Sequence, residues 1–143
     1  MARVRATDRR LFLLLEIAAR RLNRDADARL KTGAGVSASQ AAVLFLLMRK
    51  NKRRMGEIGE MLSLNPPAVT GLISRMAKAR LISRATDARD KRGALVSLTK
   101  TGAEAAERAD AVLRDFNAEL ETRLGEDDSD ALFRALTGLA ARE

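Results

Sequence analysis

The sequence of 143 residues contains no cysteine and no histidine. Without cysteine the protein cannot form disulfide bonds, bind metals through thiolates or sense redox state through a thiol. Without histidine it lacks the commonest metal ligand and the commonest general base, so we expect no metal, no cofactor and no enzymatic activity. Tryptophan and tyrosine are absent too, and aromatic residues make up 3% of the chain. This scarcity predicts an aliphatic core and a mainly helical protein.

Long hydrophobic runs are also missing. The longest are Leu11–Leu15 and Val43–Met48, which are far too short to span a bilayer. The N-terminal arginines are not followed by an apolar stretch of the length that export signals have. We therefore expect a cytoplasmic, nucleoid-associated protein with no membrane partner.

Charge is distributed unevenly along the chain. Residues 1–48 carry nine basic and four acidic side chains, and residues 49–100 carry thirteen basic and four acidic ones. Residues 101–143 reverse the balance, with five basic and eleven acidic side chains. The positive excess is thus largest in residues 49–100, as expected for the electrostatic footprint of a nucleic-acid-binding segment.

The segment from Arg53 to Thr99 carries the most informative pattern. A short helix is predicted over roughly Met55 to Leu62, and Asn65 with two prolines then marks the start of a second helix. The inward positions of this second helix recur at i, i+3, i+4 and i+7: Val69, Leu72, Ile73 and Met76. Its outward positions are small or polar first and basic further on: Thr70, Gly71, Ser74, Arg75 and Lys78. This pattern is typical of a helix-turn-helix whose second helix enters the major groove.

A predicted hairpin follows directly. Residues 82–86 and 94–98 are short runs prone to form strands, and the intervening residues 87–93 are charged and rich in turn formers. A projecting basic loop suits a narrow groove of high negative potential. An ordinary solvated hairpin would show similar charges, but the position behind a helix-turn-helix favours a DNA-binding wing.

These motifs together resemble the MarR family of winged helix-turn-helix transcriptional regulators. The resemblance rests on EIGEMLSLNPPAVTGLISRM, then LI, DARDKR and LVSLTKTG in that order, and the flanking segments extend it over nearly the whole chain. One position departs from the family pattern. Arg80 stands where the family usually has a glycine that ends the recognition helix in a left-handed turn. Either Arg80 accepts that backbone conformation or the helix ends differently.

The resemblance implies roles for the residues of this segment. Thr70, Ser74 and Arg75 would face the bases, although an ion pair within the protein is an alternative for Arg75. Arg92 corresponds to the wing arginine that the family places in the minor groove. The full predicted DNA-binding set is Arg54, Asn65, Pro67, Thr70, Gly71, Ser74, Arg75, Lys78, Arg89, Lys91 and Arg92. Arg54 and Lys78 would touch phosphates, and Asp87 and Asp90 would hold the wing arginines by paired hydrogen bonds.

The flanking segments predict further helices. One long amphipathic helix is expected over about Thr7 to Leu30, and a second, buried on several sides, is opened by a capping box at Ser37 and Gln40. Lys50 to Arg54 is expected to be a solvated basic turn. A long helix capped by Thr99 or Thr101 and a short last helix follow the wing. The predicted domains are residues 1–36, an N-terminal dimerisation helix; 37–99, the winged helix-turn-helix; and 100–143, C-terminal dimerisation helices.

The terminal helices carry more apolar surface than residues 37–100 need for a core. They could fold back on their own domain, but the family pairs through its terminal helices, which favours a homodimer. The predicted interface residues are Leu11, Leu14, Leu15, Leu113, Phe116, Leu120, Leu132, Phe133 and Leu136. Two DNA-binding segments (residues 37–99 of each copy, called the reader below), related by a two-fold axis, would lie about 34–36 Å apart. They would bind a palindrome in double-stranded DNA.

Many family members bind small aromatic acids or phenolic compounds between the dimer helices and the reader. The residues that could line such a site here are Arg20, Arg24, Leu44, Phe45 and Met48, although apolar residues at helical spacing usually belong to the core. The expected function is therefore a sequence-specific transcriptional regulator, in the commoner case a repressor. The alternatives are a non-sequence-specific architectural DNA-binding protein, an enzyme, or a protein-interaction dimer with a degenerate reader.

We predict that Arg92→Ala weakens DNA binding without unfolding the protein, because a wing side chain contributes to the interface but not to a core. A gel-shift titration, run beside a thermal melt of both proteins, checks this. Unchanged affinity with a normal melting temperature would remove Arg92 from the DNA-binding set.

Overall fold

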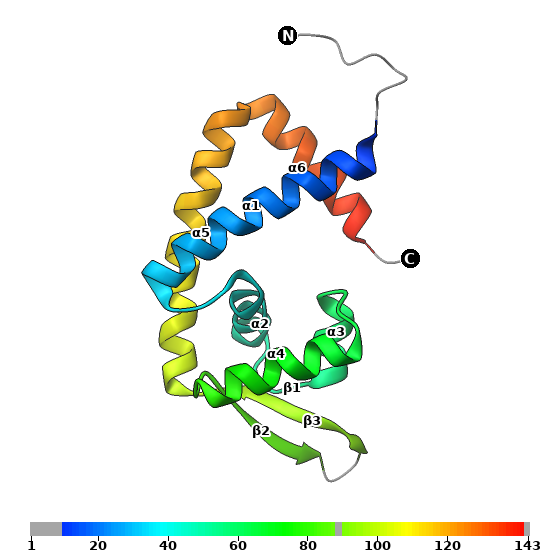
Figure 1. Cartoon of the computed structure of the whole chain (residues 1–143), viewed down its shortest axis with the longest axis vertical. Helices are drawn as coiled ribbons and strands as arrows, with labels where there is room; N and C mark the ends of the chain where they lie inside the picture. The colour runs from blue at the N-terminus through cyan, green and yellow to red at the C-terminus, as the bar shows by residue number, and fades with distance from the viewer. Residues whose placement is uncertain (1–9, 88–89, 142–143) are drawn as a thin grey trace.

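The computed structural model describes residues 10–87 and 90–141, apart from the side chains of residues 87 and 90–92. Over these residues the chain forms six helices and one three-stranded antiparallel sheet, which confirms the predicted fold class (Figure 1). The elements in chain order are α1 Leu11–Ala34, α2 Ala38–Arg49, β1 Arg53–Arg54, α3 Met55–Met61, α4 Pro66–Lys78, β2 Ile82–Asp87, β3 Asp90–Leu98, α5 Lys100–Leu124 and α6 Glu126–Ala140.

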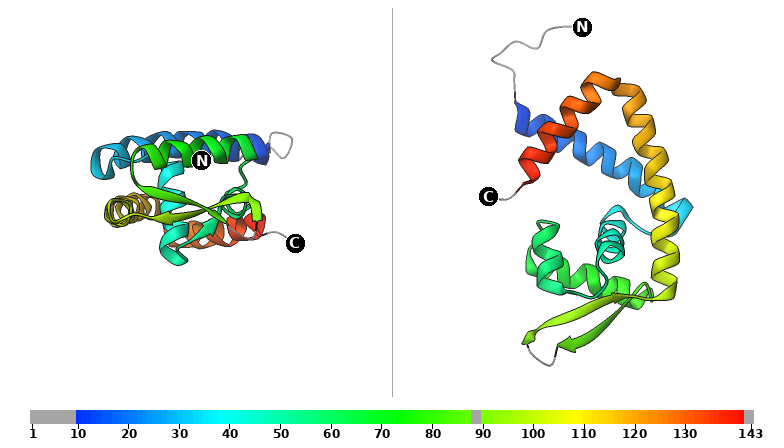
Figure 2. Two further views of the ribbon diagram at one scale, coloured as in Figure 1. Left: turned by 90° about the horizontal axis from the view of Figure 1, so that it is seen from below. Right: turned by 180° about the vertical axis from the view of Figure 1, so that it is seen from behind.

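The helices divide between two ends of the molecule. The helices α2, α3 and α4 lie with the sheet at one end, and α5 runs from the sheet towards the other end, where α1 and α6 lie (Figure 1). Seen from below, α1 and α6 lie on opposite sides of the molecule (Figure 2). None of the described helices is by itself long and apolar enough to cross a membrane; α1 and α2 pass that test only jointly, across a bend of 67°.

The core joins the second half of α1, most of α2, Ile58 of α3, the inner face of α4, the base of the hairpin and the first turns of α5. Its largest fully buried side chains include Leu30, Leu44, Leu47, Ile73 and Met76. The helix opened by the capping box at Ser37 was predicted to be buried on several sides. This is confirmed, because that helix, α2, passes through the middle of this core.

The predicted caps hold with one correction. Ser37 and Gln40 form the reciprocal capping box, and the side chain of Asn65 accepts a hydrogen bond from Ala68 N at 2.9 Å. The helix α5 is capped by Thr99, whose hydroxyl oxygen accepts from Gly102 N at 2.9 Å. The alternative cap at Thr101 is therefore wrong, because Thr101 already lies inside the helix.

The sheet contains a strand that the sequence did not predict. The order is β1-β3-β2, and Arg53 and Arg54 of β1 pair with Val96 and Leu95 of β3. The expectation of a solvated turn up to Arg54 is thus wrong at its end. Two residues are too few for an alternating pattern, so only the tertiary pairing reveals the strand.

The helix α4 ends in the left-handed turn that the resemblance implied, with an arginine in place of glycine. Arg80 has φ +62°. The N–H of Leu81 donates to the carbonyl oxygen of Met76 at 3.0 Å, and the Thr99 hydroxyl donates to the carbonyl oxygen of Arg80 at 2.6 Å. These bonds satisfy helix-end carbonyl groups and hold Arg80 in a conformation that costs a residue with a Cβ roughly 1 kcal/mol.

We predict that Arg80→Gly raises the free energy of unfolding by about 0.5–1 kcal/mol, because glycine adopts a positive φ without that strain. Lys78→Gly is the matched control, since it places glycine at a helical position of α4 and lowers stability by about 0.5–1 kcal/mol. Urea unfolding of the three proteins measures both effects. A lower stability for Arg80→Gly would show that the arginine side chain outweighs the strain.

Candidate nucleic-acid interface

The helix α4 has two distinct faces. Val69, Leu72, Ile73 and Met76 are buried against the core, as the spacing predicted. The opposite face consists of the exposed Thr70, Arg75 and Lys78 and the partly exposed Gly71 and Ser74. The structure therefore brings the predicted outward residues of this helix together on one solvent-facing strip.

The leading end of α4 is low and exposed. Asn65, Pro66, Pro67 and Ala68 are all exposed, and Pro66 occupies the first helical position. The oxygen of the Asn65 amide is engaged in the cap. Short side chains at this end allow the helix backbone to approach another surface closely, as a helix in the major groove requires.

Arg75 extends back along the helix rather than into an ion pair. A Cβ built on Gly71 would lie 3.3 Å from Nη1 of Arg75, so the guanidinium lies over the bare backbone of Gly71. Among the described side chains no carboxylate pairs with Arg75. The alternative of a structural ion pair for Arg75 thus has no support there.

Arg84 is a basic residue of this surface that the sequence analysis missed. It lies on β2, is exposed, and its Nη1 donates to Ser74 Oγ on α4 at 3.4 Å. Strand alternation could have found it, because Arg84 is two residues after the buried Ile82 and so shares the face of β2 that turns towards α4.

The hairpin is confirmed and is longer than predicted. The strands pair from Ile82 opposite Leu98 to Thr86 opposite Ala94, with an irregularity at Thr86 and Asp87. Arg89 lies outside the described residues, as do the side chains of Asp87, Asp90, Lys91 and Arg92. The roles assigned to these five residues stay predictions.

The basic run before α3 divides into two kinds of residue. Arg54 is exposed at the start of α3 and makes contacts within the protein. Arg53 is 8% exposed and is the only buried polar or charged side chain among the described residues. The prediction that this run is wholly solvated is therefore wrong at Arg53.

The predicted dimer residues fall into two groups. Leu11, Leu14 and Leu15 of α1 and Leu132, Phe133 and Leu136 of α6 are exposed. The second group, on α5, is partly covered by the chain itself. Leu113 packs on the core, Leu120 is partly buried, and the ring of Phe116 lies 5.0 Å from the guanidinium of Arg29.

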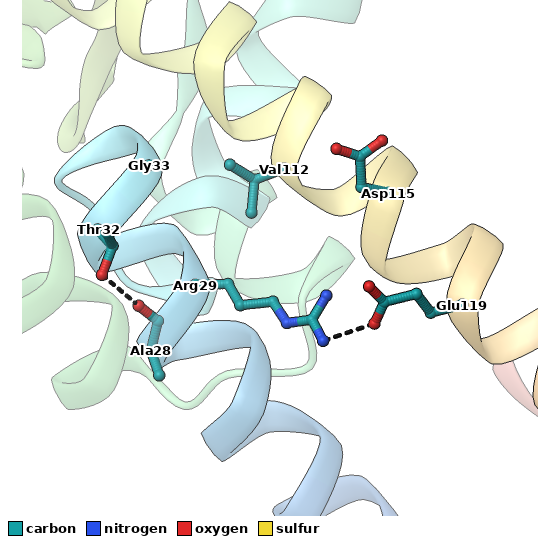
Figure 3. Close-up of a pocket in the computed structure, with 7 residues that line it drawn as sticks. All are labelled: Ala28, Arg29, Thr32, Gly33, Val112, Asp115 and Glu119. Carbon is teal, nitrogen blue, oxygen red and sulfur yellow. Dashed lines mark hydrogen bonds and ion pairs between the residues drawn. The ribbon is translucent and has the colours of Figure 1, made fainter.

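A shallow depression of about 500 Å³ lies between α1 and α5, beside that contact (Figure 3). Arg29 crosses it and donates to the carboxylate of Glu119, with which it also forms an ion pair. The hydrogen bond from Arg29 lowers the pKa of Glu119 from its ordinary value. The contact ties the two long helices together at their exposed side.

The five residues predicted to line a ligand site lie on α1 and α2. Leu44 is fully buried in the core, Phe45 packs against the core, and Met48 is exposed at the end of α2. Arg20 pairs with Glu16 of its own helix at 3.5 Å. The ligand-binding role of these residues and of Arg24 stays a prediction.

Comparisons with known proteins agree with this architecture. The family model described as MarR family matches residues 34–93. An uncharacterized HTH-type transcriptional regulator of Mycobacterium bovis is 29% identical over 126 residues, which cover 88% of this chain and 87% of that protein.

Two solved structures extend the likeness to the whole fold. A probable transcriptional regulator from Pseudomonas aeruginosa has a TM-score of 0.76 and 26% identity, covering 94% of this chain and 99% of that one. A mutant MarR from E. coli complexed with operator DNA has a TM-score of 0.73 and 25% identity, covering 90% and 94% of the two chains. The chain thus contains a segment that matches the MarR family, and its fold is that of winged helix-turn-helix transcriptional regulators.

Proposed function

We propose that this protein binds double-stranded DNA in a sequence-specific manner, with α4 in the major groove and the β2–β3 wing in an adjacent minor groove. The single observation that carries the proposal is the outer strip of α4, which is polar and slim at its leading end and lies within the most basic part of the chain. Polar side chains on such a helix can reach base edges, while basic ones neutralise phosphates.

The residues of this surface take different roles. Thr70, Ser74 and Arg75 face the bases, and Arg54 and Lys78 contact phosphates. Arg92 enters the minor groove, with Arg89 and Lys91 beside it. Arg84 joins the set because its contact with Ser74 places a positive charge between the helix and the wing. Asn65, Pro67 and Gly71 shape the leading face, and Asp87 and Asp90 support the wing.

The protein acts as a homodimer in this proposal. The exposed apolar residues of the terminal helices include Leu11 at 66% and Phe133 at 72% exposure, and α6 packs chiefly on α5 within the chain. Surfaces of this kind, on two helices at the same end of the molecule, need a partner. A second copy covers them with the same surface and gives a two-fold arrangement of readers.

A dimer of this kind represses by occluding a promoter, and a small aromatic or phenolic ligand releases it. The residues 1–36 and 100–143 supply the dimerisation region, and residues 37–99 supply the reader. A non-sequence-specific architectural protein is the second candidate, because the excess of positive charge in residues 49–100 would also bind phosphates without reading bases.

Selection of bound fragments from random-sequence DNA, repeated at two salt concentrations, tests the proposed function. We expect an inverted repeat whose half-sites lie about 10–10.5 base pairs apart, since two readers on one face of the duplex are spaced by a helical turn. Recovery of no motif, with affinity that collapses as salt rises, would favour the architectural protein.

We predict that Phe133→Glu converts the dimer into monomers, because it places a charge in an apolar interface. The dimer dissociation constant should rise by about thirtyfold or more, the size of effect found at central interface residues. The matched control is Arg134→Glu, which introduces the same side chain at the neighbouring exposed position of α6. Analytical ultracentrifugation measures both proteins, and an unchanged dimer in Phe133→Glu would exclude α6 from the interface.

A further inference from the structure

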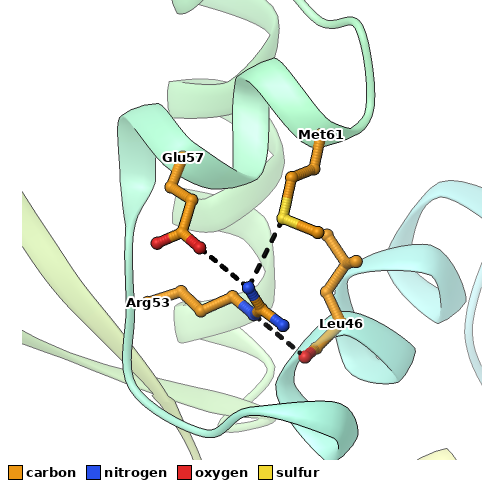
Figure 4. A network of polar contacts seen from close by, with 4 residues as sticks. All are labelled: Leu46, Arg53, Glu57 and Met61. Carbon is orange, nitrogen blue, oxygen red and sulfur yellow. Dashed lines mark hydrogen bonds and ion pairs between the residues drawn. The ribbon is translucent and has the colours of Figure 1, made fainter. Parts of the chain in front are cut away.

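The side chain of Arg53 connects two helices of the segment 37–99, α2 and α3. Its Nε donates to the carbonyl oxygen of Leu46 in α2 at 3.0 Å, and its Nη1 donates to Oε1 of Glu57 in α3 at 2.8 Å (Figure 4). The same Nη1 lies 3.4 Å from Sδ of Met61, at the end of α3. The guanidinium therefore contacts the last turns of α2 and both ends of α3.

The backbone of Arg53 belongs to a different part of the reader. It pairs with Val96 of β3, the strand that continues into the wing. The side chain of Arg53 thus points into the helices while its backbone is part of the sheet. No other described residue joins the wing sheet to α3 through a buried charged side chain.

The rigid coupling continues from α3 to the recognition helix. The N–H of Leu64 donates to the carbonyl oxygen of Gly59 at 2.8 Å, in the turn between the helices. A Cβ on Gly59 would lie 3.0 Å from the side chain of Val69, so α3 and α4 approach closely there. The Thr70 hydroxyl also lies 3.9 Å from Sδ of Met55. A change in the orientation of α3 is therefore passed to the outer strip of α4.

The burial of this arginine is one-sided, because the Arg53 side chain is 9% exposed and that of Glu57 is 39% exposed. Loss of hydration at Arg53 offsets part of its attraction to Glu57, so a large gain in stability is not expected from the pair. The network instead fixes the relative orientation of its partners, because a planar guanidinium donates hydrogen bonds at defined angles. An aliphatic side chain cannot do this.

We propose that Arg53 is a positioning residue that sets the angle between the helix-turn-helix and the wing, so that α4 and Arg92 engage DNA together. This inference rests on the proposed function. It assigns Arg53 no contact with DNA, although Arg53 lies in the basic run of residues 50–54, because its side chain is buried and each of its contacts is internal.

The test compares DNA affinity across Arg53→Met, Arg92→Ala and the double variant, using the DNA recovered by selection and fluorescence anisotropy at several salt concentrations. Methionine keeps a long unbranched side chain and removes the guanidinium. We expect Arg53→Met to weaken binding about tenfold, within the range found for residues that act without touching the ligand. The slope of log affinity against log salt should stay unchanged, since no phosphate contact is lost.

The double variant measures whether the effects of the two substitutions on DNA affinity are additive. A purely structural role of Arg53 would leave them additive. If Arg53 aligns the wing, Arg92→Ala should cost much less affinity in the Arg53→Met background than in the wild type, because the misaligned wing has already lost its contact. Lys52→Met is the matched control, as it removes an exposed charge from the same basic run and should leave the cost of Arg92→Ala unchanged.

Three results would overturn the inference. Additive effects of Arg53→Met and Arg92→Ala would show that Arg53 does not align the wing. A salt slope reduced by about 0.9 would show that Arg53 contacts a phosphate. Wild-type protein that binds no DNA would overturn the proposed function and this inference with it. If Arg53→Met does not fold, Glu57→Gln replaces it in the comparison with Arg92→Ala. We then expect DNA affinity to fall about threefold, with the same non-additivity.

Discussion

The close approach of α5 to the end of the recognition helix is the constraint on which the rest of the structure depends. A Cβ on Gly102 would lie only 1.8 Å from the carbonyl oxygen of Leu81, so no other residue fits there without moving the backbone. Thr99 donates to the same region twice, through its N–H to Leu81 and through its hydroxyl to Arg80. The end of α4, the start of β2 and the start of α5 are thereby held as one junction.

That junction explains why Arg80 can replace a glycine. The surrounding hydrogen bonds hold the positive φ at this position, and the side chain of Arg80 is exposed. Strain of about 1 kcal/mol persists in proteins where the neighbouring structure determines the conformation. The turn is therefore a property of the α4–β2–α5 junction. A glycine at position 80 would lower the conformational cost of the turn but is not needed to determine its backbone conformation.

Local signals allowed most of the fold to be predicted, and tertiary contacts account for what was missed. Caps at Ser37, Asn65 and Thr99 act within one turn of chain, so they are visible in sequence. The burial of Arg53 depends on Leu46 and Glu57, which no local pattern connects to it. At the candidate interface, the helical periodicity of α4 was enough to predict its outer strip. The apolar stripe of α5 was also visible in the sequence, but a stripe alone does not identify the helix that packs on it.

The stripe of α5 also shows how the reader is linked to the opposite end of the molecule. The helix runs without interruption from Lys100, at the junction, to Leu124, where α6 begins. Along the way Arg29 of α1 holds it through Glu119 and the ring of Phe116. If the proposed dimer forms through α1 and α6, α5 is the element that connects its interface to the junction at Gly102 and so to α4. The proposed function therefore predicts that contacts far from the DNA influence the spacing of the two recognition helices.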